Sequence, residues 1–189
     1  RYTFRYPYRG LAGCMGRKTG IEKQPLLGPG HHVMTMTELR ELTVARYANV
    51  GRRIDLFTKL ERLVSELVAQ KVPCDLWIDG SFLTDEDDPW DIDIALRVMD
   101  DVMQTLTSEQ NAFLTRMAAD DWAYIEGLDT FVFTGYWLGH PYYRTEVDDG
   151  FCTKLPSWGW QFGLGRDDWL KGIVVVPILE NDLGLRIRR

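Results

Sequence analysis

Two short groups of residues in the middle of the chain have the types and spacing of a site for metal ions and phosphates. Asp91 and Asp93 lie two residues apart at the start of an apolar run, 92–96, which predicts a strand with both side chains on one face. Two carboxylates this close repel each other unless a cation lies between them. Hard divalent ions such as Mg²⁺ bind carboxylates and keep positions for phosphate oxygens. This pair is therefore a candidate metal site.

Gly80 and Ser81 form the second group, at the end of the apolar run 76–78. Glycine lets a phosphate approach the backbone closely, and a serine that begins a helical turn offers its amide and hydroxyl to an anion. The connector, residues 82–90, separates this turn from Asp91. A Gly-Ser turn followed by paired acids between two apolar runs predicts a phosphate site next to a metal site.

Each candidate also has a purely structural interpretation. Asp91 and Asp93 could form a solvated strand face, although paired acids within an apolar run are then costly to desolvate. Asp79, directly before Gly80, could cap or brace the turn. Asp129, at the head of the apolar run 128–133, is either a third site acid or an ordinary residue at the start of a strand.

The elements that must position these residues follow from hydrophobic period and capping signals. Thr35 and Glu38 predict a capping box for a first helix that ends near Tyr47. A second helix is predicted over 52–70, because apolar residues recur there at helical spacing. The stripe consists of Ile54, Leu56, Phe57, Leu60, Leu63, Val64, Leu67 and Val68.

Further elements complete an α+β fold. Strands are predicted at 75–79, 91–98 and 128–133, and a third helix at 109–119. Strands at 159–164 and 172–179 predict a C-terminal β-hairpin, and residues 1–33 are predicted to be loop. The expected architecture is a small mixed β-sheet with helices packed mainly on one face, plus this hairpin.

Charge and composition bound the function classes. The chain has 189 residues and a net charge of −6, which fits one domain over 25–189. A basic segment, 1–24, precedes it, with six basic residues and one glutamate; we expect it to be poorly ordered. The acidic remainder disfavours long nucleic acid as a partner.

Cysteine usage and hydropathy indicate the compartment. Three cysteines without metal-ligand spacing predict reduced thiols and a cytoplasmic location. No apolar stretch reaches the roughly 18–20 residues that span a bilayer, so we expect no membrane association.

The order Gly80-Ser81, then Asp91-Ile92-Asp93, resembles the signature of nucleotidyltransferases of the DNA polymerase β type. The resemblance implies that Asp91 and Asp93 hold two Mg²⁺ ions and that the Gly-Ser turn binds the β and γ phosphates of a nucleoside triphosphate. It also implies that Asp129 completes the metal site and activates the acceptor hydroxyl. The implied reaction transfers a nucleoside monophosphate, AMP from ATP, to a hydroxyl of a protein or small molecule.

A second resemblance covers about residues 25–178. The segments 26–32, 77–82 and 161–174 are similar to small bacterial uncharacterised nucleotidyltransferase-like (DUF6932-like) proteins, some of which resemble the minimal nucleotidyltransferases of toxin–antitoxin systems. This implies a partner protein, a toxin or other acceptor. The minimal transferases carry basic residues after Gly-Ser, where this chain has Phe82 and then four acids, 85–88. The candidates for the missing positive charge are Arg97, Lys154, Arg166 and Lys171.

Two other functions stay open at this point. A transferase fold that no longer catalyses could act as an antitoxin-like binding partner through the acidic connector and the aromatic segment 135–159. A metal-dependent phosphohydrolase or nuclease is disfavoured by the acidic composition and by the absence of a His-Asp cluster in the sequence.

Overall fold

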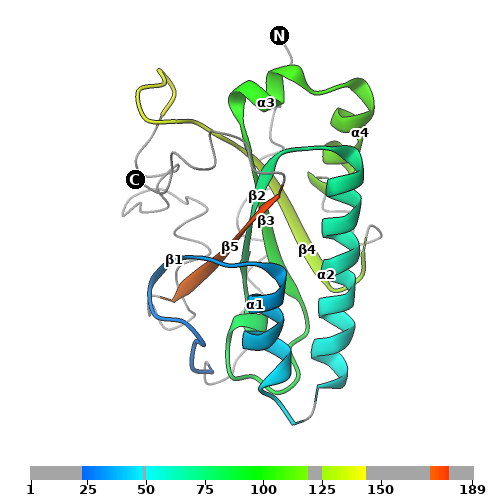
Figure 1. Ribbon diagram of the computed structural model, residues 1–189, viewed down its shortest axis with the longest axis vertical. Helices are drawn as coiled ribbons and strands as arrows, with labels where there is room; N and C mark the ends of the chain where they lie inside the picture. Colours follow the sequence, from blue (N-terminus) through cyan, green and yellow to red (C-terminus); the bar gives the residue numbers. More distant parts are fainter. Residues whose placement is uncertain (1–22, 49, 119–124, 144–170, 179–189) are drawn as a thin grey trace, which may run out of the picture.

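The structure, a computed structural model, describes residues 23–48, 50–118, 125–143 and 171–178. Figure 1 shows the elements of these residues, a mixed α+β set that confirms the predicted fold class. In chain order they are β1 (Gly30–Val33), α1 (Met36–Arg40), a π-helical turn (Glu41–Ala45), α2 (Gly51–Gln70), β2 (Cys74–Asp79), a 3₁₀ turn (Ser81–Leu83), β3 (Ile92–Met99), α3 (Asp100–Thr105), α4 (Ser108–Ala118), β4 (Leu128–Gly135) and β5 (Gly172–Ile178).

The five described strands form one mixed sheet in the order β1-β5-β2-β3-β4. β2 is antiparallel to both of its neighbours, β5 and β3. The outer pairs, β1 with β5 and β3 with β4, are parallel. β5, the last described strand, therefore lies inside the sheet, between β1 and the central strand β2. The first strand of the predicted hairpin, 159–164, is outside the described residues. Both edges of β5 are already paired, with β1 and with β2, so β5 is not the second strand of a simple hairpin.

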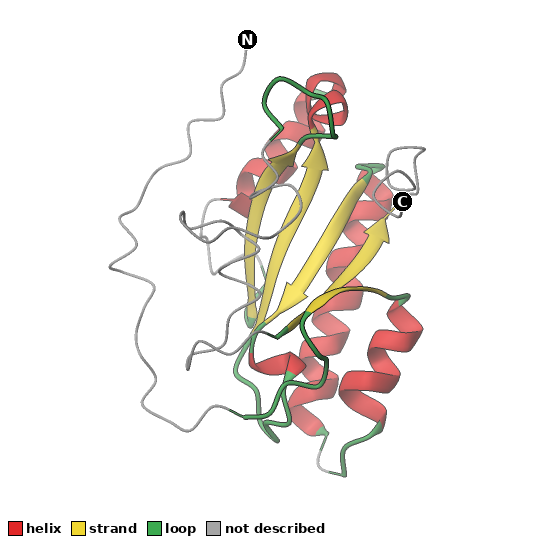
Figure 2. Ribbon diagram, turned by 90° about the vertical axis from the view of Figure 1, so that its left-hand side faces the viewer, coloured by secondary structure: helices red, strands yellow, loops and turns green. Residues whose placement is uncertain are grey.

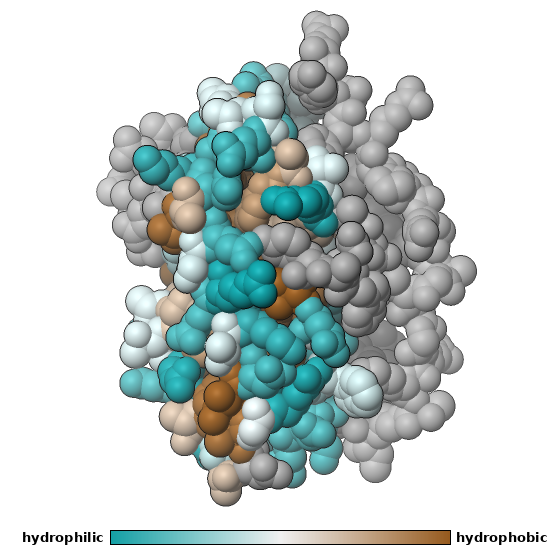
Figure 3. Space-filling model, turned by 90° about the vertical axis from the view of Figure 1, so that its right-hand side faces the viewer, coloured by the Kyte–Doolittle hydropathy of each residue, from teal (hydrophilic) through white to brown (hydrophobic). Residues whose placement is uncertain are grey.

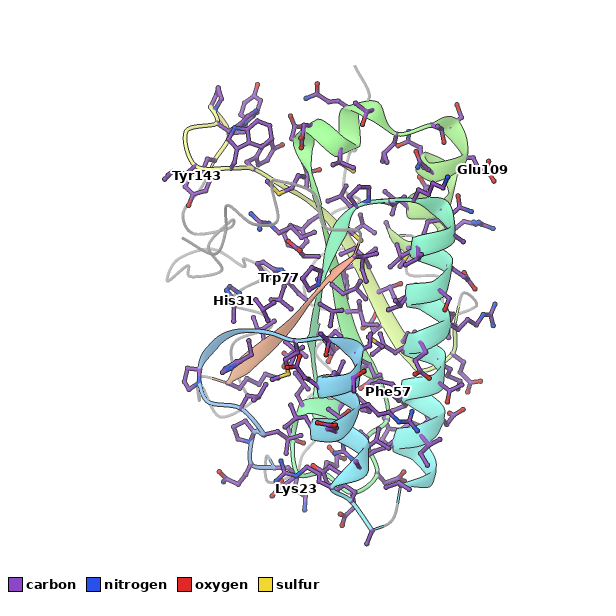
Figure 4. All side chains as sticks on the ribbon, in the orientation of Figure 1. Lys23, His31, Phe57, Trp77, Glu109 and Tyr143 are labelled. Carbon is purple, nitrogen blue, oxygen red and sulfur yellow. The ribbon has the colours of Figure 1, made fainter. Side chains whose placement is uncertain are left out.

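One face of the sheet carries the main hydrophobic core. Strand residues such as Leu76, Ile94 and Val174 are fully buried there, together with Leu60 and Leu67 of α2. Figure 1 shows α2 running along this face, and in Figure 4 Phe57 points between α1 and α2. On the side of the molecule where α2 lies, the outer surface, turned away from the sheet, is largely hydrophilic (Figure 3). Helix and strands are thus joined by burial of their apolar faces.

The predicted stripe on α2 is correct in its centre and wrong at two of its edge positions. Leu56, Phe57, Leu60, Leu63 and Leu67 are buried. Ile54 and Val68 are instead exposed. A stripe read from sequence is wider than the contact surface because only one helix face meets the sheet.

The opposite face has a smaller apolar cluster. Its members come from four strands: Trp77, Ala95, Phe133, Ile173 and Val175. Figure 2 shows the strands in front of α2, viewed onto this face. His31 of β1 lies against Trp77, with ring centroids 4.8 Å apart, and both are labelled on the side away from α2 in Figure 4.

Two local predictions have opposite outcomes. The capping box is confirmed, because the Thr35 amide donates to Glu38 Oε2 at 2.7 Å and the Glu38 amide donates to Thr35 Oγ1 at 3.2 Å. The prediction of loop for all of residues 1–33 is wrong at 30–33, which form the strand β1. A strand of four residues is too short to show a period, and its partner β5 is remote in the sequence.

Candidate functional site

Three aspartates from neighbouring strands lie side by side at one end of the sheet. Asp79 is the last residue of β2 and pairs with Asp93 of β3, which in turn pairs with Asp129 of β4. Residues directly opposite each other in a ladder place their side chains on the same face. This face is the one opposite α2, since Asp79 alternates with the buried core residue Ile78. We call these three residues the acid row.

The structure thus brings together two of the three predicted site acids, Asp93 and Asp129. Asp91 precedes the first residue of β3 and lies outside the ladder, with its side chain partly buried. For Asp79 the sequence suggests only that it caps or braces the turn. Its place in the row depends on the β2–β3 register, which no local sequence signal reveals.

Gly80 lets the row approach the turn. Its φ is +89°, in the region that favours glycine. A Cβ at this position would also collide with the carboxylate of Asp93. The glycine is therefore required twice, once by its backbone conformation and once by the Asp93 side chain that lies against it.

Ser81 begins the short 3₁₀ turn that follows. The turn is closed by the Leu83 amide donating to Gly80 O at 3.2 Å and by the Thr84 amide donating to Ser81 O at 3.1 Å. The Ser81 hydroxyl oxygen is buried and has no hydrogen-bond partner among the described residues. A buried hydroxyl without a partner is costly, so a ligand oxygen that reached this atom would stabilise it.

Asp79 is a buried acid with only one of its two oxygens paired among the described residues. It is 3% exposed; its Oδ2 lies 2.9 Å from Lys171 Nζ, and its Oδ1 has no partner among the described residues. Burial raises the pKa of Asp79 to about 7, with Asp93 adding to the rise and Lys171 opposing it. If a cation bound beside it, the pKa of the Asp79 carboxyl would fall, because a nearby positive charge favours the ionised form.

The connector is anchored by a residue that the sequence did not single out. Arg53 of α2 is fully buried. Its Nη1 donates to the carbonyls of Thr43 at 3.0 Å and Phe82 at 2.9 Å, and its Nη2 to those of Thr84 at 2.8 Å and Glu86 at 2.5 Å. These contacts fix the backbone of the connector directly after Ser81.

Tyr47 completes this Arg53 cluster. Its ring lies 3.9 Å from the Arg53 guanidinium carbon, and its hydroxyl donates to Thr84 O at 2.9 Å. Burial lowers the pKa of Arg53 and raises that of Tyr47, and an arginine still stays protonated. An arginine next to apolar stripe positions could have been noticed in the sequence, but only the fold shows what it binds.

The acids of the connector turn to solvent beyond this anchor. Asp85, Asp87 and Asp88 are exposed, and Trp90 is 70% exposed. The Trp90 carbonyl accepts a hydrogen bond of 2.6 Å from Arg52 Nη2. None of these acids belongs to the acid row, so the row and the acidic connector are two separate features.

The candidate cations lie in different places relative to the acid row. Arg97 is buried, with Nη1 3.9 Å from Asp75 Oδ2, and it lies four residues along β3 from Asp93, roughly 13 Å at the rise of a strand. Lys171 reaches the acid row, as described above. Lys154 and Arg166 lie outside the described residues.

The donor types fit Mg²⁺, while the described side chains are not yet a complete coordination shell. Carboxylate and hydroxyl oxygens are the ligands that Mg²⁺ prefers, and two of them, Asp79 Oδ1 and Ser81 Oγ, are buried without a partner in the described part of the chain. Within that same part, no group of three or more His, Cys, Asp or Glu side chains is arranged to hold a metal ion. Water and phosphate oxygens normally supply the remaining ligands of Mg²⁺.

Comparison with known proteins places the chain in a family. A profile of a family of unknown function, DUF6932, matches residues 20–177, and the chain belongs to this family. Searches of curated proteins and of solved structures gave no match. No helix among the described residues is long and apolar enough to cross a membrane.

Proposed function

We propose that this protein is a Mg²⁺-dependent nucleotidyltransferase of the DNA polymerase β type. The observation that carries the proposal is the pairing of Asp93 with Asp129 in a row that lies against the Gly80-Ser81 turn. Carboxylates of two strands lie beside a turn whose Ser81 hydroxyl has no partner among the described residues. They offer a cation and a phosphate neighbouring positions. The donor is a nucleoside triphosphate, ATP in the first instance, and the acceptor is a hydroxyl of a protein or small molecule.

Each residue has a role in the proposed reaction. Gly80 and Ser81 would receive the β and γ phosphates, and Asp91, Asp93 and Asp129 would hold the metal ions. Bound Mg²⁺ would supply charge stabilisation to the attacking and leaving oxygens. The acceptor oxygen bonds to the α-phosphorus, the bond from that phosphorus to the bridging oxygen breaks, and pyrophosphate leaves. The carboxylate of Asp129 takes the proton of the acceptor hydroxyl.

The test is transfer of label from each α-labelled nucleoside triphosphate, with Mg²⁺, to the product of the neighbouring gene and to the protein itself. Asp91→Ala, Asp93→Ala and Asp129→Ala should each abolish transfer and keep a cooperative unfolding transition. Asp88→Ala removes an exposed acid of the connector and should transfer like the wild type. Transfer that survives loss of Asp93 and of Asp129 would rule out this mechanism.

A binding role is the second candidate, supported by exposed apolar side chains. Trp90 in the connector is 70% exposed, and Leu138 and Tyr142 beyond β4 are 82% and 67% exposed. Trp90 lies beside the exposed acids of the connector, and exposed apolar groups rimmed by polar residues mark protein interaction sites. Leu138 and Tyr142 lie at the opposite end of the sheet, since β3 and β4 run parallel. If this role holds, a complex with the partner survives Asp93→Ala and chelation of metal, and Trp90→Ala weakens it.

A further inference from the structure

The acid row has one cationic partner that comes from the far end of the described chain. Lys171 directly precedes β5, and its Nζ lies 2.9 Å from Asp79 Oδ2. The Lys171 side chain is 12% exposed and that of Asp79 is 4% exposed. A buried ion pair contributes little net stability, because desolvation offsets the attraction. The pair therefore needs an explanation other than stability.

The strand register places Lys171 at the Gly-Ser turn. β5 runs antiparallel to β2, and their last matched residues are Val174 and Ile78. From there, each step back along β5 corresponds to a step forward along β2, so the chain before Val174 runs toward Gly80 and Ser81. Lys171 thus belongs to the end of the sheet where the acid row and the turn lie.

The backbone next to Lys171 is held tightly. A Cβ at Gly172 would lie 2.5 Å from Gly28 O and 2.7 Å from Leu27 Cβ. The Gly172 amide donates to Leu27 O at 3.3 Å. This packing fixes the point from which the Lys171 side chain extends, as a binding residue requires.

Charge makes Lys171 important for any anion at the turn. The segment from Gly80 to Asp91 contains five acids and no lysine or arginine. A phosphate that approaches Ser81 therefore meets no cation from the turn or the connector. The ammonium of Lys171 has three N–H donors, and Asp79 is its only ionic partner among the described residues.

We propose that Lys171 is the phosphate-binding cation of this site and that Asp79 positions it beside the Gly80-Ser81 turn. The inference rests on the proposed function, since it assigns the triphosphate of that reaction a protein cation. Lys171, brought to the turn by the fold, supplies the positive charge that a basic residue directly after Gly-Ser would otherwise provide. Asp79 is a positioning residue, which holds the ammonium through Oδ2.

The test is calorimetric titration of the full chain, with Mg²⁺ present, with inorganic tripolyphosphate and separately with ATP. Lys171→Met should weaken binding of both ligands by roughly 10- to 100-fold, the range for a hydrogen bond to a charged group. Lys171→Arg, which keeps the charge, should bind within about a few-fold of the wild type. Lys59→Met is the matched control, because Lys59 also forms a 2.9 Å pair with an aspartate, Asp55, but on α2; it should bind like the wild type.

A double variant keeps the test valid if Lys171→Met unfolds because it leaves the buried Asp79 without its partner. Asp79→Asn with Lys171→Met removes both charges, which a protein tolerates better than the loss of one. The double variant should show the same loss of tripolyphosphate binding as the single one.

The outcomes separate this inference from the proposed function. Wild-type affinity in Lys171→Met, or in the folded double variant, overturns the assignment of Lys171 and leaves the transferase intact. Weakened tripolyphosphate binding, with no transfer of label from any triphosphate, supports Lys171 and removes the transferase. A wild-type protein that binds neither tripolyphosphate nor ATP overturns both.

Discussion

The Arg53 cluster and the acid row are both buried and polar, and they differ in how their atoms are paired. Arg53 donates four hydrogen bonds to backbone carbonyls and lies over the Tyr47 ring. In the acid row and the adjoining turn, Asp79 Oδ1 and Ser81 Oγ have no partner among the described residues. The first lies on the α2 side of the connector, and the second lies on the opposite face of the sheet.

The difference distinguishes buried polar groups that stabilise the fold, as in the Arg53 cluster, from buried polar groups that could bind a ligand, as in the acid row. The Arg53 guanidinium is bonded to neutral carbonyls and holds the backbone of the connector in one conformation. Only its Nε has no partner within the described residues. An unpaired buried oxygen costs about 1–3 kcal/mol, which a bound cation or phosphate would offset. We expect variants of the first cluster to change stability, and variants of the second to change ligand binding.

The largest expected effect is that of Arg53→Met. The carbonyls of four residues lose their donor, so the free energy of unfolding should fall by about 3–5 kcal/mol, as for other broken buried networks. Urea unfolding followed by circular dichroism measures it. The control is Arg62→Met, which removes an exposed pair with Glu66 and should cost less than about 0.5 kcal/mol. Equal losses in the two variants would show that the Arg53 cluster is not a structural anchor.

Asp79 should make stability depend on pH. Its folded pKa, about 7, lies above the ordinary value of 3.8 for an aspartate. Between these values the unfolded chain has released the proton and the folded protein retains it. The contribution of Asp79 to stability is therefore highest at and below pH 4, falls as pH rises to 7, and is level above that.

The expected fall from this group is about 4 kcal/mol, since its pKa rises by about three units and each unit corresponds to about 1.4 kcal/mol. Urea unfolding from pH 4.5 to 8 in a metal chelator should show a smaller fall in Asp79→Asn than in the wild type. Asp55→Asn, which breaks a surface pair with Lys59, should keep the wild-type slope. An unchanged slope in Asp79→Asn would contradict the raised pKa of this buried acid.

Gly80→Ala should destabilise the fold more than the matched variant Gly139→Ala. Both glycines have φ near +90°, so both substitutions carry backbone strain of about 1–3 kcal/mol. Only at Gly80 would the new Cβ also meet the Asp93 carboxylate, whereas at Gly139 nothing lies within 4 Å. The difference between the two losses in thermal or urea unfolding measures the contact of Asp93 with the turn. Equal losses would place that carboxylate away from Gly80.

The smallest expected effect is stabilisation by Mg²⁺. At a concentration about ten times its dissociation constant, Mg²⁺ should add about 1.4 kcal/mol to the free energy of unfolding, seen as a rise in the melting temperature at pH 7.5. Asp93→Asn should lose this rise, and Arg62→Met should keep it. A rise that persists in Asp93→Asn would locate the cation elsewhere and weaken the contrast between the two clusters.

The elements were largely predictable because their signals are local. The capping box at Thr35, the apolar spacing of α2 and the runs that became β2, β3 and β4 depend on neighbours within a few residues. The Gly80-Ser81 turn and the acid Asp93 were visible for the same reason. The short strand β1 was missed because four residues carry no period.

The sequence by itself determined which residues could do chemistry, and the tertiary structure decided which of them meet. Asp79 joins Asp93 and Asp129 through strand register, Lys171 reaches them because β5 inserts beside β2, and Arg53 finds its carbonyls on segments far along the chain. Each is a contact between residues distant in sequence. Such contacts depend on which strands pair and in what register, and no local pattern in one chain specifies that.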